Sequence, residues 1–125
     1  MQNRLRVIGS GKNYWSCVQV DDLAAAFAAA LERAPAGSEY NVVDDEPLLL
    51  RDLVDEVTGA MGMNRVGNIP SWLIGLIIGG PLVQSLVASF RVLNTKARRE
   101  LEWVPRFPRA REAIRAAIDG LRRAS

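Results

Sequence analysis

Acidic side chains form two compact groups in this 125-residue sequence, and each group follows an expected strand. Asp21 and Asp22 follow Val18–Val20, and Asp44–Glu46 follows Tyr40–Val43. Paired carboxylates can serve as general acid and base, or can bind a hard cation. At a helix N-terminus they instead accept hydrogen bonds from the free N–H groups of the first turn. We favour capping for the first pair and a solvated turn for the second group, whose spacing differs from that of a calcium loop.

The sequence contains no histidine and a single cysteine, Cys17. Without histidine the chain lacks the commonest general base and the commonest transition-metal ligand, so neither a Ser-His nor a Cys-His nucleophile can be built within it. Cys17 has no cation near it in sequence, so we interpret it as a small buried hydrophobe. We expect no metal site and no internal disulfide. With no signal-peptide pattern at residues 1–4, the sequence predicts a cytoplasmic protein.

The net charge of +2 conceals an asymmetry along the chain. Residues 1–90 carry six basic and ten acidic side chains, a net charge of −4, whereas residues 91–125 carry ten basic and four acidic ones, a net charge of +6. A basic tail can meet phosphate or an acidic partner. Because no aromatic residues alternate with its arginines for base stacking, we expect a solvated helix face and no nucleic-acid binding.

The elements that position these groups alternate between strand and helix patterns. Residues 4–8 and 15–20 alternate polar and apolar side chains around the turn-forming Gly9–Asn13, which predicts an N-terminal β-hairpin. A further strand is expected at 39–43. Helices are expected after Asp22, over 49–61 with a stop at Gly62, over 96–101 and over 109–122. The fold class is α/β: a small sheet packed with four to five helices, in one domain over 1–125.

Two helices within this pattern raise specific expectations. The helix after Asp22 has an apolar stripe formed by Leu23, Phe27, Ala30 and Leu31, and its alanines at 24–26, 28 and 29 are expected to let it pack closely against a sheet. Within residues 70–90, residues 72–83 are apolar on every side. Gly79–Pro81 interrupts this run and Gln84 and Ser85 follow it, so it is too short to span a membrane. We expect two short helices that line an apolar pocket or are covered by a partner, with docking at a membrane surface as the less favoured alternative.

Three segments resemble one family in their order along the chain. They are Val18-Gln19-Val20-Asp21-Asp22-Leu23-Ala24, Tyr40-Asn41-Val42 and Lys96-Ala97-Arg98-Arg99-Glu100-Leu101-Glu102-Trp103-x-Pro105. They are similar to the C-terminal part of extended short-chain dehydrogenases/reductases, the NAD-dependent epimerase/dehydratase superfamily, whose fold is of the Rossmann type. In that family the tyrosine-asparagine-valine strand belongs to the nucleotide-binding sheet.

Two parts of the family pattern do not occur in this sequence: the glycine-rich phosphate loop and the catalytic tyrosine-x-x-x-lysine. Gly9-x-Gly11 does not match the loop, because a strand rather than a helix is expected after it. The resemblance therefore implies a substrate-domain-like fragment that lacks the dinucleotide-binding half, binds no cofactor and is inactive in hydride transfer by itself. It implies NAD(P) for the parent enzyme, which would act in oxidation-reduction, epimerisation or dehydration.

The resemblance also places candidate substrate-binding residues. The family's loop matching Asn13, Tyr14 and Trp15 lies beside the substrate, although Trp15 could equally be a core residue. Gln19 and Trp72 complete the candidate set. Trp15 stands where members that act on sugar nucleotides often have an arginine, and an indole cannot bind a diphosphate in that way. Together with the apolar run 72–83, this favours a small hydroxy or keto substrate.

Partners are expected from the same features. Strand 39–43 would lack neighbours in a fragment, and residues 72–90 would expose apolar surface. We expect either a homo-oligomer or a complex with a complementing nucleotide-binding half, and a hydrophobic small molecule is a possible ligand of a mobile 72–90 segment. The alternative function is a stand-alone binding or assembly module that self-associates or binds a hydrophobic ligand through residues 72–90.

Overall fold

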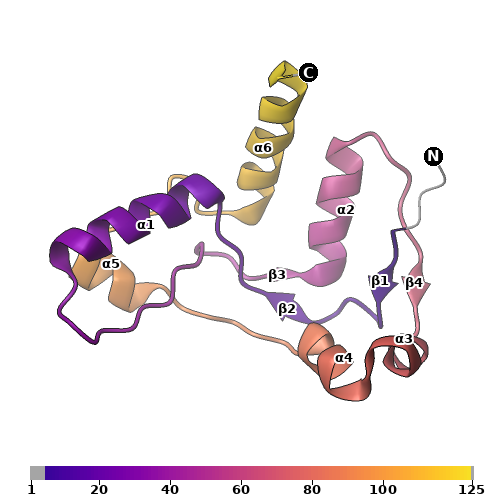
Figure 1. Cartoon of the computed structure of the whole chain (residues 1–125). Coiled ribbons are helices and arrows are strands. Elements are labelled where there is room, and N and C mark those ends of the chain that lie inside the picture. The colour runs from indigo at the N-terminus through magenta and orange to yellow at the C-terminus, as the bar shows by residue number, and fades with distance from the viewer. Residues whose placement is uncertain (1–4, 125) are drawn as a thin grey trace.

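The computed structural model describes residues 5–124, and within that range the chain has an α/β architecture with six helices and four very short strands (Figure 1). In chain order these elements are β1 (Val7–Ile8), β2 (Tyr14–Trp15), α1 (Val20–Arg33), β3 (Leu48–Leu49), α2 (Leu50–Ala60), β4 (Asn68–Ile69), α3 (Ser71–Ile78), α4 (Gly80–Val87), α5 (Thr95–Leu101) and α6 (Ala110–Ala124). The predicted fold class is confirmed. The expected first strand begins at residue 4, which lies outside the described residues.

The helices pack in three pairs along the molecule. Figure 1 shows α1 beside α5 at one end, α3 beside α4 at the other, and α2 near α6 between them. β2 and β3 lie in the middle of the molecule, whereas β1 and β4 lie side by side at its edge, above α3 (Figure 1). None of the helices within 5–124 is both long and apolar enough to cross a membrane.

The strands pair differently from the expected hairpin. β1 pairs in parallel with β4, with Val7 opposite Asn68, and β2 pairs antiparallel with β3, with Tyr14 opposite Leu49. The predicted pairing of the two N-terminal strands is therefore wrong. The reason lies at Gly11, whose φ is +68° and whose absent Cβ would lie 2.8 Å from Val7 Cγ1 and 2.9 Å from the Cβ of Arg51. The turn packs against the start of α2, and this directs β2 towards β3.

Residues 39–43 form no ladder within the described part of the chain. Contacts with α5 and its N-cap fix this segment instead: the Tyr40 hydroxyl donates to Glu100 Oε2 at 3.1 Å, and Asn94 Nδ2 donates to the Val43 carbonyl at 2.8 Å. The expected strand is therefore absent in this range. A strand requires a hydrogen-bonded neighbour, and none of the described segments supplies one.

The core at the α1–α5 end consists of Ala26, Ala97, Leu101 and Trp103. α1 turns its alanines rather than its large side chains towards this core, since Ala26 is 1% exposed while Leu31 is 91% exposed and Phe27 is 65% exposed. The predicted stripe is therefore only partly covered: Leu23 and Ala30 are half-buried, whereas Phe27 and Leu31 are exposed. The alanines allow the expected close packing, but against α5 rather than against a sheet.

The N-terminus of α1 also differs from expectation. Gln19, not an aspartate, is the N-cap: its Oε1 accepts hydrogen bonds from the N–H groups of Asp21 and Asp22, the latter at 3.2 Å. Asp22 is 1% exposed, and its side chain contacts a segment that is distant in the sequence. Its carboxylate accepts from the N–H groups of Arg106 and Phe107 at 2.9 and 3.0 Å. The carboxylate therefore joins α1 to the segment that precedes α6.

We predict that Asp22→Ala lowers the free energy of unfolding by about 3 kcal/mol, because it removes two charge-assisted hydrogen bonds and leaves the Arg106 and Phe107 N–H groups without an acceptor. Urea denaturation followed by circular dichroism measures this. The matched control is Asp21→Ala, at an exposed neighbouring carboxylate, with an expected loss below about 1 kcal/mol. Equal losses in both variants would contradict the anchoring role.

Candidate functional site

A cleft of about 390 Å³ lies between the β1–β2 turn and the α3–α4 helices. Its lining residues are Ile8, Gly9, Ser10, Lys12, Asn13, Ser71, Val87 and Ser89. Gly9, with φ +67°, shapes the turn, and Asn68 Nδ2 fixes it by donating to the Gly9 carbonyl at 2.7 Å. We call this the Lys12 cleft.

Asn13 and Tyr14 fasten the β1–β2 turn to the chain that follows α4. Asn13 is buried, and its Nδ2 donates to the carbonyls of Leu86 and Ala88 at 3.2 and 3.3 Å. The Tyr14 N–H donates to Ser89 Oγ at 3.0 Å, and the Arg91 guanidinium lies 3.8 Å from the Tyr14 ring centroid. Asn13 thus lines the cleft, and Tyr14 adjoins it.

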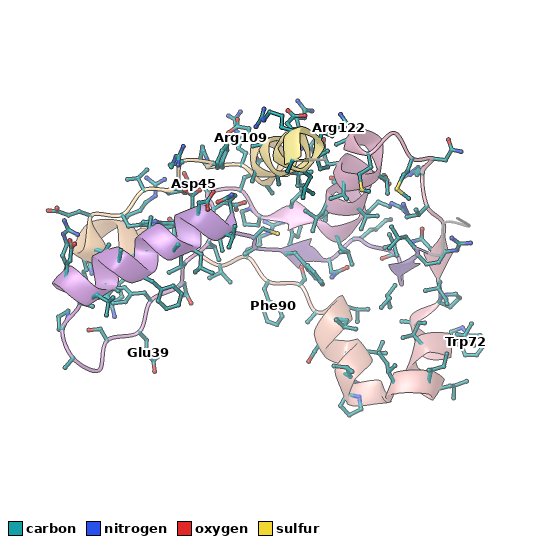
Figure 2. The ribbon with its side chains drawn as sticks, turned by 45° about the horizontal axis from the view of Figure 1, so that its top comes forward. Glu39, Asp45, Trp72, Phe90, Arg109 and Arg122 are labelled. Atoms are coloured by element: carbon teal, nitrogen blue, oxygen red, sulfur yellow. The ribbon has the colours of Figure 1, made fainter. Side chains whose placement is uncertain are left out.

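The structure does not bring the other three candidates into this cleft. Trp15 is half-buried opposite Leu48 in the β2–β3 ladder. Both polar atoms of the Gln19 side chain already form hydrogen bonds. Its Oε1 accepts from the N–H groups at the start of α1, and its Nε2 donates to Asp21 Oδ2 at 3.0 Å. Trp72 is 68% exposed on α3 and is not one of the residues that line the cleft. Figure 2 shows it far from Phe90, which directly follows the cleft residue Ser89. The five candidates therefore do not form one site.

The residues that give the Lys12 cleft its charge and its hydroxyl groups are not among the five predicted candidates. Lys12 makes no ion pair within the part of the chain that the structure describes, and Ser10, Ser71 and Ser89 surround the same space. Ser71 is the first residue of α3, where backbone N–H groups are free of intrahelical partners. The one available signal was that Lys12 is one of only two lysines and stands in a glycine turn.

Apolar side chains cover the α3–α4 end, next to this cleft. Those more than a third exposed are Trp72, Leu73, Leu76, Ile77, Ile78 and Leu82, which together we call the α3–α4 apolar surface. Two short helices were predicted, and Gly79 with φ +92° divides them as expected. Single exposed apolar residues are ordinary, whereas six on two neighbouring helices are more than a folded chain commonly exposes in one region.

A second, smaller cleft of about 230 Å³ lies between α2, α6 and the segment that leads into α1. We call it the Asp44 cleft. Its lining residues are Cys17, Val18, Gln19, Val20, Asp44, Leu53, Ala110, Ala113, Ile114 and Ala117. No group of three potential metal ligands converges here or elsewhere within residues 5–124.

The two titratable groups of the Asp44 cleft have raised pKa values. Burial raises the pKa of Asp44 to about 6; a hydrogen bond from the Glu46 N–H opposes this rise, and the charges of Asp45 and Glu46 add to it. Burial, together with the nearby Asp44 charge, raises the pKa of the Cys17 thiol. A thiol with a raised pKa is a poor nucleophile at neutral pH, which agrees with the interpretation of Cys17 as a small hydrophobe.

We predict that Asp44→Asn stabilises the fold at pH 7.5 by up to about 3 kcal/mol and has little effect at pH 4. Because the folded-state pKa of Asp44 lies above its ordinary value, its stabilising contribution is present at low pH and is lost as the pH rises through about 6. Asparagine keeps an acceptor for the Glu46 N–H without the buried charge. Thermal unfolding of both proteins between pH 4 and 8 tests this, and a difference in melting temperature that does not change with pH would contradict it.

Comparisons with known proteins place this architecture in context. No family model matches the sequence. The chain is 35% identical over 83 residues to a 2-alkyl-3-oxoalkanoate reductase from Stenotrophomonas maltophilia, a match that covers 62% of this chain and 25% of the relative. It is 25% identical over 114 residues to a 3-diazoavenalumate denitrifying reductase from a Streptomyces species, covering 91% of this chain and 37% of that protein.

The comparison with solved structures agrees with these sequence matches. The human epimerase family protein SDR39U1 with NADPH superposes with a TM-score of 0.81 at 19% identity, over 91% of this chain and 38% of the human protein. These matches confirm the resemblance to the Rossmann-type fold of short-chain dehydrogenases/reductases. The chain spans a quarter to about two-fifths of the length of the relatives that it matches.

Proposed function

We propose that this chain is the substrate-binding part of an NAD(P)-dependent reductase that acts on an apolar oxo or hydroxy acid. The observation that carries the proposal is the position of the Lys12 cleft, whose walls include the first residue of α3 and the last of α4. An ammonium group, three hydroxyls and free helix N–H groups therefore adjoin the α3–α4 apolar surface. A ligand with one anionic head and an alkyl body complements both features.

The chemistry of the cleft supports a carboxylate as the head group. Lys12 supplies a positive charge, Ser10 and Ser89 can donate hydrogen bonds, and the N-terminus of α3 favours an anion. The name of one relative, 2-alkyl-3-oxoalkanoate reductase, describes a substrate with a carboxylate and alkyl groups. The same combination in this chain would give a substrate of that chemical class.

The cofactor would be held by a nucleotide-binding part outside these 125 residues. Pyrophosphate binding in this fold uses a glycine-rich turn that connects a strand to a helix. The Gly9–Gly11 turn leads instead into β2. In this proposal the present chain contributes substrate contacts and the nucleotide-binding part contributes the hydride transfer.

We predict that decanoate binds the chain and that Lys12→Met weakens this binding about tenfold, because the lost charge-assisted hydrogen bond is worth about 1.5 kcal/mol. Decanol, which shares the alkyl body but has no charge, should bind both proteins equally. Isothermal titration calorimetry at low salt measures these affinities.

The matched control is Lys96→Met, because Lys96 lies at the opposite end of the molecule, where its Nζ donates to the Glu39 carbonyl at 3.0 Å. Decanoate should bind this variant as it binds the original chain. If both lysine variants lose affinity equally, decanoate is attracted by general charge and the Lys12 cleft is not its site.

A second candidate function, a module that self-associates, is favoured by one observation. Leu76 and Ile77 on α3 are 76% and 74% exposed, more than a soluble monomer commonly leaves to water in adjacent apolar residues. Pairing of two such surfaces would bury them. This function needs no cofactor and no enzyme activity.

We predict that the chain forms dimers or larger assemblies at high micromolar concentration and that the double variant Leu76→Ser, Ile77→Ser is monomeric with little loss of melting temperature. The exposed side chains contribute to association rather than to the core. Light scattering combined with thermal unfolding measures both quantities. Leu31→Ser, at an equally exposed leucine on α1, is the control and should leave association unchanged. A monomeric original chain would contradict self-association while leaving the decanoate result unaffected.

A further inference from the structure

The Asp44 cleft contains a buried carboxylate that has little hydrogen bonding within the described residues. Asp44 is 4% exposed, and Oδ1 accepts one hydrogen bond, from the Glu46 N–H at 3.3 Å. Residues 5–124 supply no donor for Oδ2, and because no fully buried polar side-chain atom among them lacks a partner, Oδ2 is open to the cleft. A buried carboxylate with so few partners is unfavourable unless a positive charge or several donors compensate it.

The neighbouring carboxylates both have such partners. Asp45 pairs with the Arg98 guanidinium and also accepts from Asn94 Nδ2 at 2.8 Å. Glu46 lies 3.6 Å from Arg109 Nε. Of three consecutive acidic residues, the most buried one is thus the one without an arginine among the described residues.

The other walls of the cleft supply no cation either. α2 contributes Leu53, and α6 contributes four apolar residues: Ala110, Ala113, Ile114 and Ala117. The remaining polar groups are the Cys17 thiol and the Gln19 amide, and the amide is committed to the α1 cap and to Asp21. Within this cleft, therefore, one negative charge faces an apolar wall.

We propose that the Asp44 cleft is a binding site for a small primary alkylammonium ion. This ion would supply the positive charge that none of the described residues brings to Asp44. The ammonium group would lie against the Asp44 carboxylate, and the alkyl chain would follow Ile114 and Ala117 along α6. A volume of about 230 Å³ accommodates a chain of about four carbons, since a water molecule occupies about 30 Å³. One carboxylate and one thiol are too few ligands for a metal ion, which leaves an organic cation as the complementary ligand.

The groups that face Asp44 define how binding depends on pH. They are the Cys17 thiol from the segment before α1 and the carboxylates of Asp45 and Glu46 from its own segment; the residues of α2 and α6 that line the cleft are uncharged. Alkylammonium binding requires the ionised form of Asp44. The affinity is therefore constant above the pKa of Asp44 and falls about tenfold for each pH unit below it.

The experiment is an NMR titration of the ¹⁵N-labelled 125-residue chain with n-butylammonium and, in parallel, with n-butanol. At pH 7.5 we expect butylammonium to bind at least about tenfold more tightly and to shift the Cys17 and Ala113 amide resonances. Saturating butylammonium should also slow alkylation of Cys17, the sole cysteine of the sequence, because its thiol lines the same cleft.

Three variants separate this site from general attraction to acidic residues. Asp44→Asn should abolish the preference for butylammonium over butanol, whereas Glu46→Gln should retain it, because Glu46 does not line the cleft. Ala113→Phe, which fills the cleft, should weaken binding of both compounds. If Asp44→Asn fails to fold, the fall in affinity of the unmodified chain below pH 6 replaces it as the test.

Equal affinity for butylammonium and butanol would overturn the proposal. So would equal effects of Asp44→Asn and Glu46→Gln, since the cation would then respond to surface charge alone. These measurements involve neither Lys12 nor decanoate, so their failure does not affect the proposed substrate site.

Discussion

The buried carboxylate of Asp22 is the interaction on which the arrangement of the α1–α5 end and of α6 depends. It accepts the N–H groups of Arg106 and Phe107, and the Asp22 carbonyl accepts the indole Nε1–H of Trp103 at 3.0 Å. Helix α5 ends at Glu102, whose φ of +53° turns the chain so that Trp103 enters the core. These bonds link residues more than eighty positions apart, and they set where α6 begins. The Asp44 cleft, with a wall on α6, follows from that placement.

Helix positions could be predicted from this sequence, but strand partners could not. The breaks at Gly62 and Gly79 are glycines with positive φ, a conformation that other residues adopt only with strain, so the local sequence is sufficient to place them. Alternation correctly predicted strand at Val7–Ile8 and at Trp15, but alternation carries no information about the neighbouring strand. The close approach of Gly11 to Arg51 decided the pairing, and that contact spans forty residues.

The candidate site was predictable to a similar extent. Asn13 and Tyr14 could be named because they match a loop that lies beside the substrate in the family, and in the structure Asn13 lines the Lys12 cleft while Tyr14 adjoins it. Ser71 and Ser89 could not be named, since they are separated by a whole helical hairpin from each other and meet Lys12 only in three dimensions. Gln19 was named for substrate binding, but the structure uses it as the α1 cap. Aspartate is a preferred N-cap residue, but the Asp22 carboxylate already accepts hydrogen bonds from the N–H groups of Arg106 and Phe107.

The aspartates of the two acidic groups show that surroundings rather than motif set the role of a carboxylate. Asp22 is buried with two backbone donors and acts as an anchor. Partial burial raises the pKa of Asp45, but hydrogen bonds from Arg98 and Asn94 outweigh this and leave its pKa below the ordinary value. Asp44 is almost as buried as Asp22 yet has one weak donor, so its pKa is raised. A sequence that stabilises two of these charges and leaves the third facing an apolar cleft retains an unfavourable group, and carboxylates with raised pKa values are concentrated at functional sites.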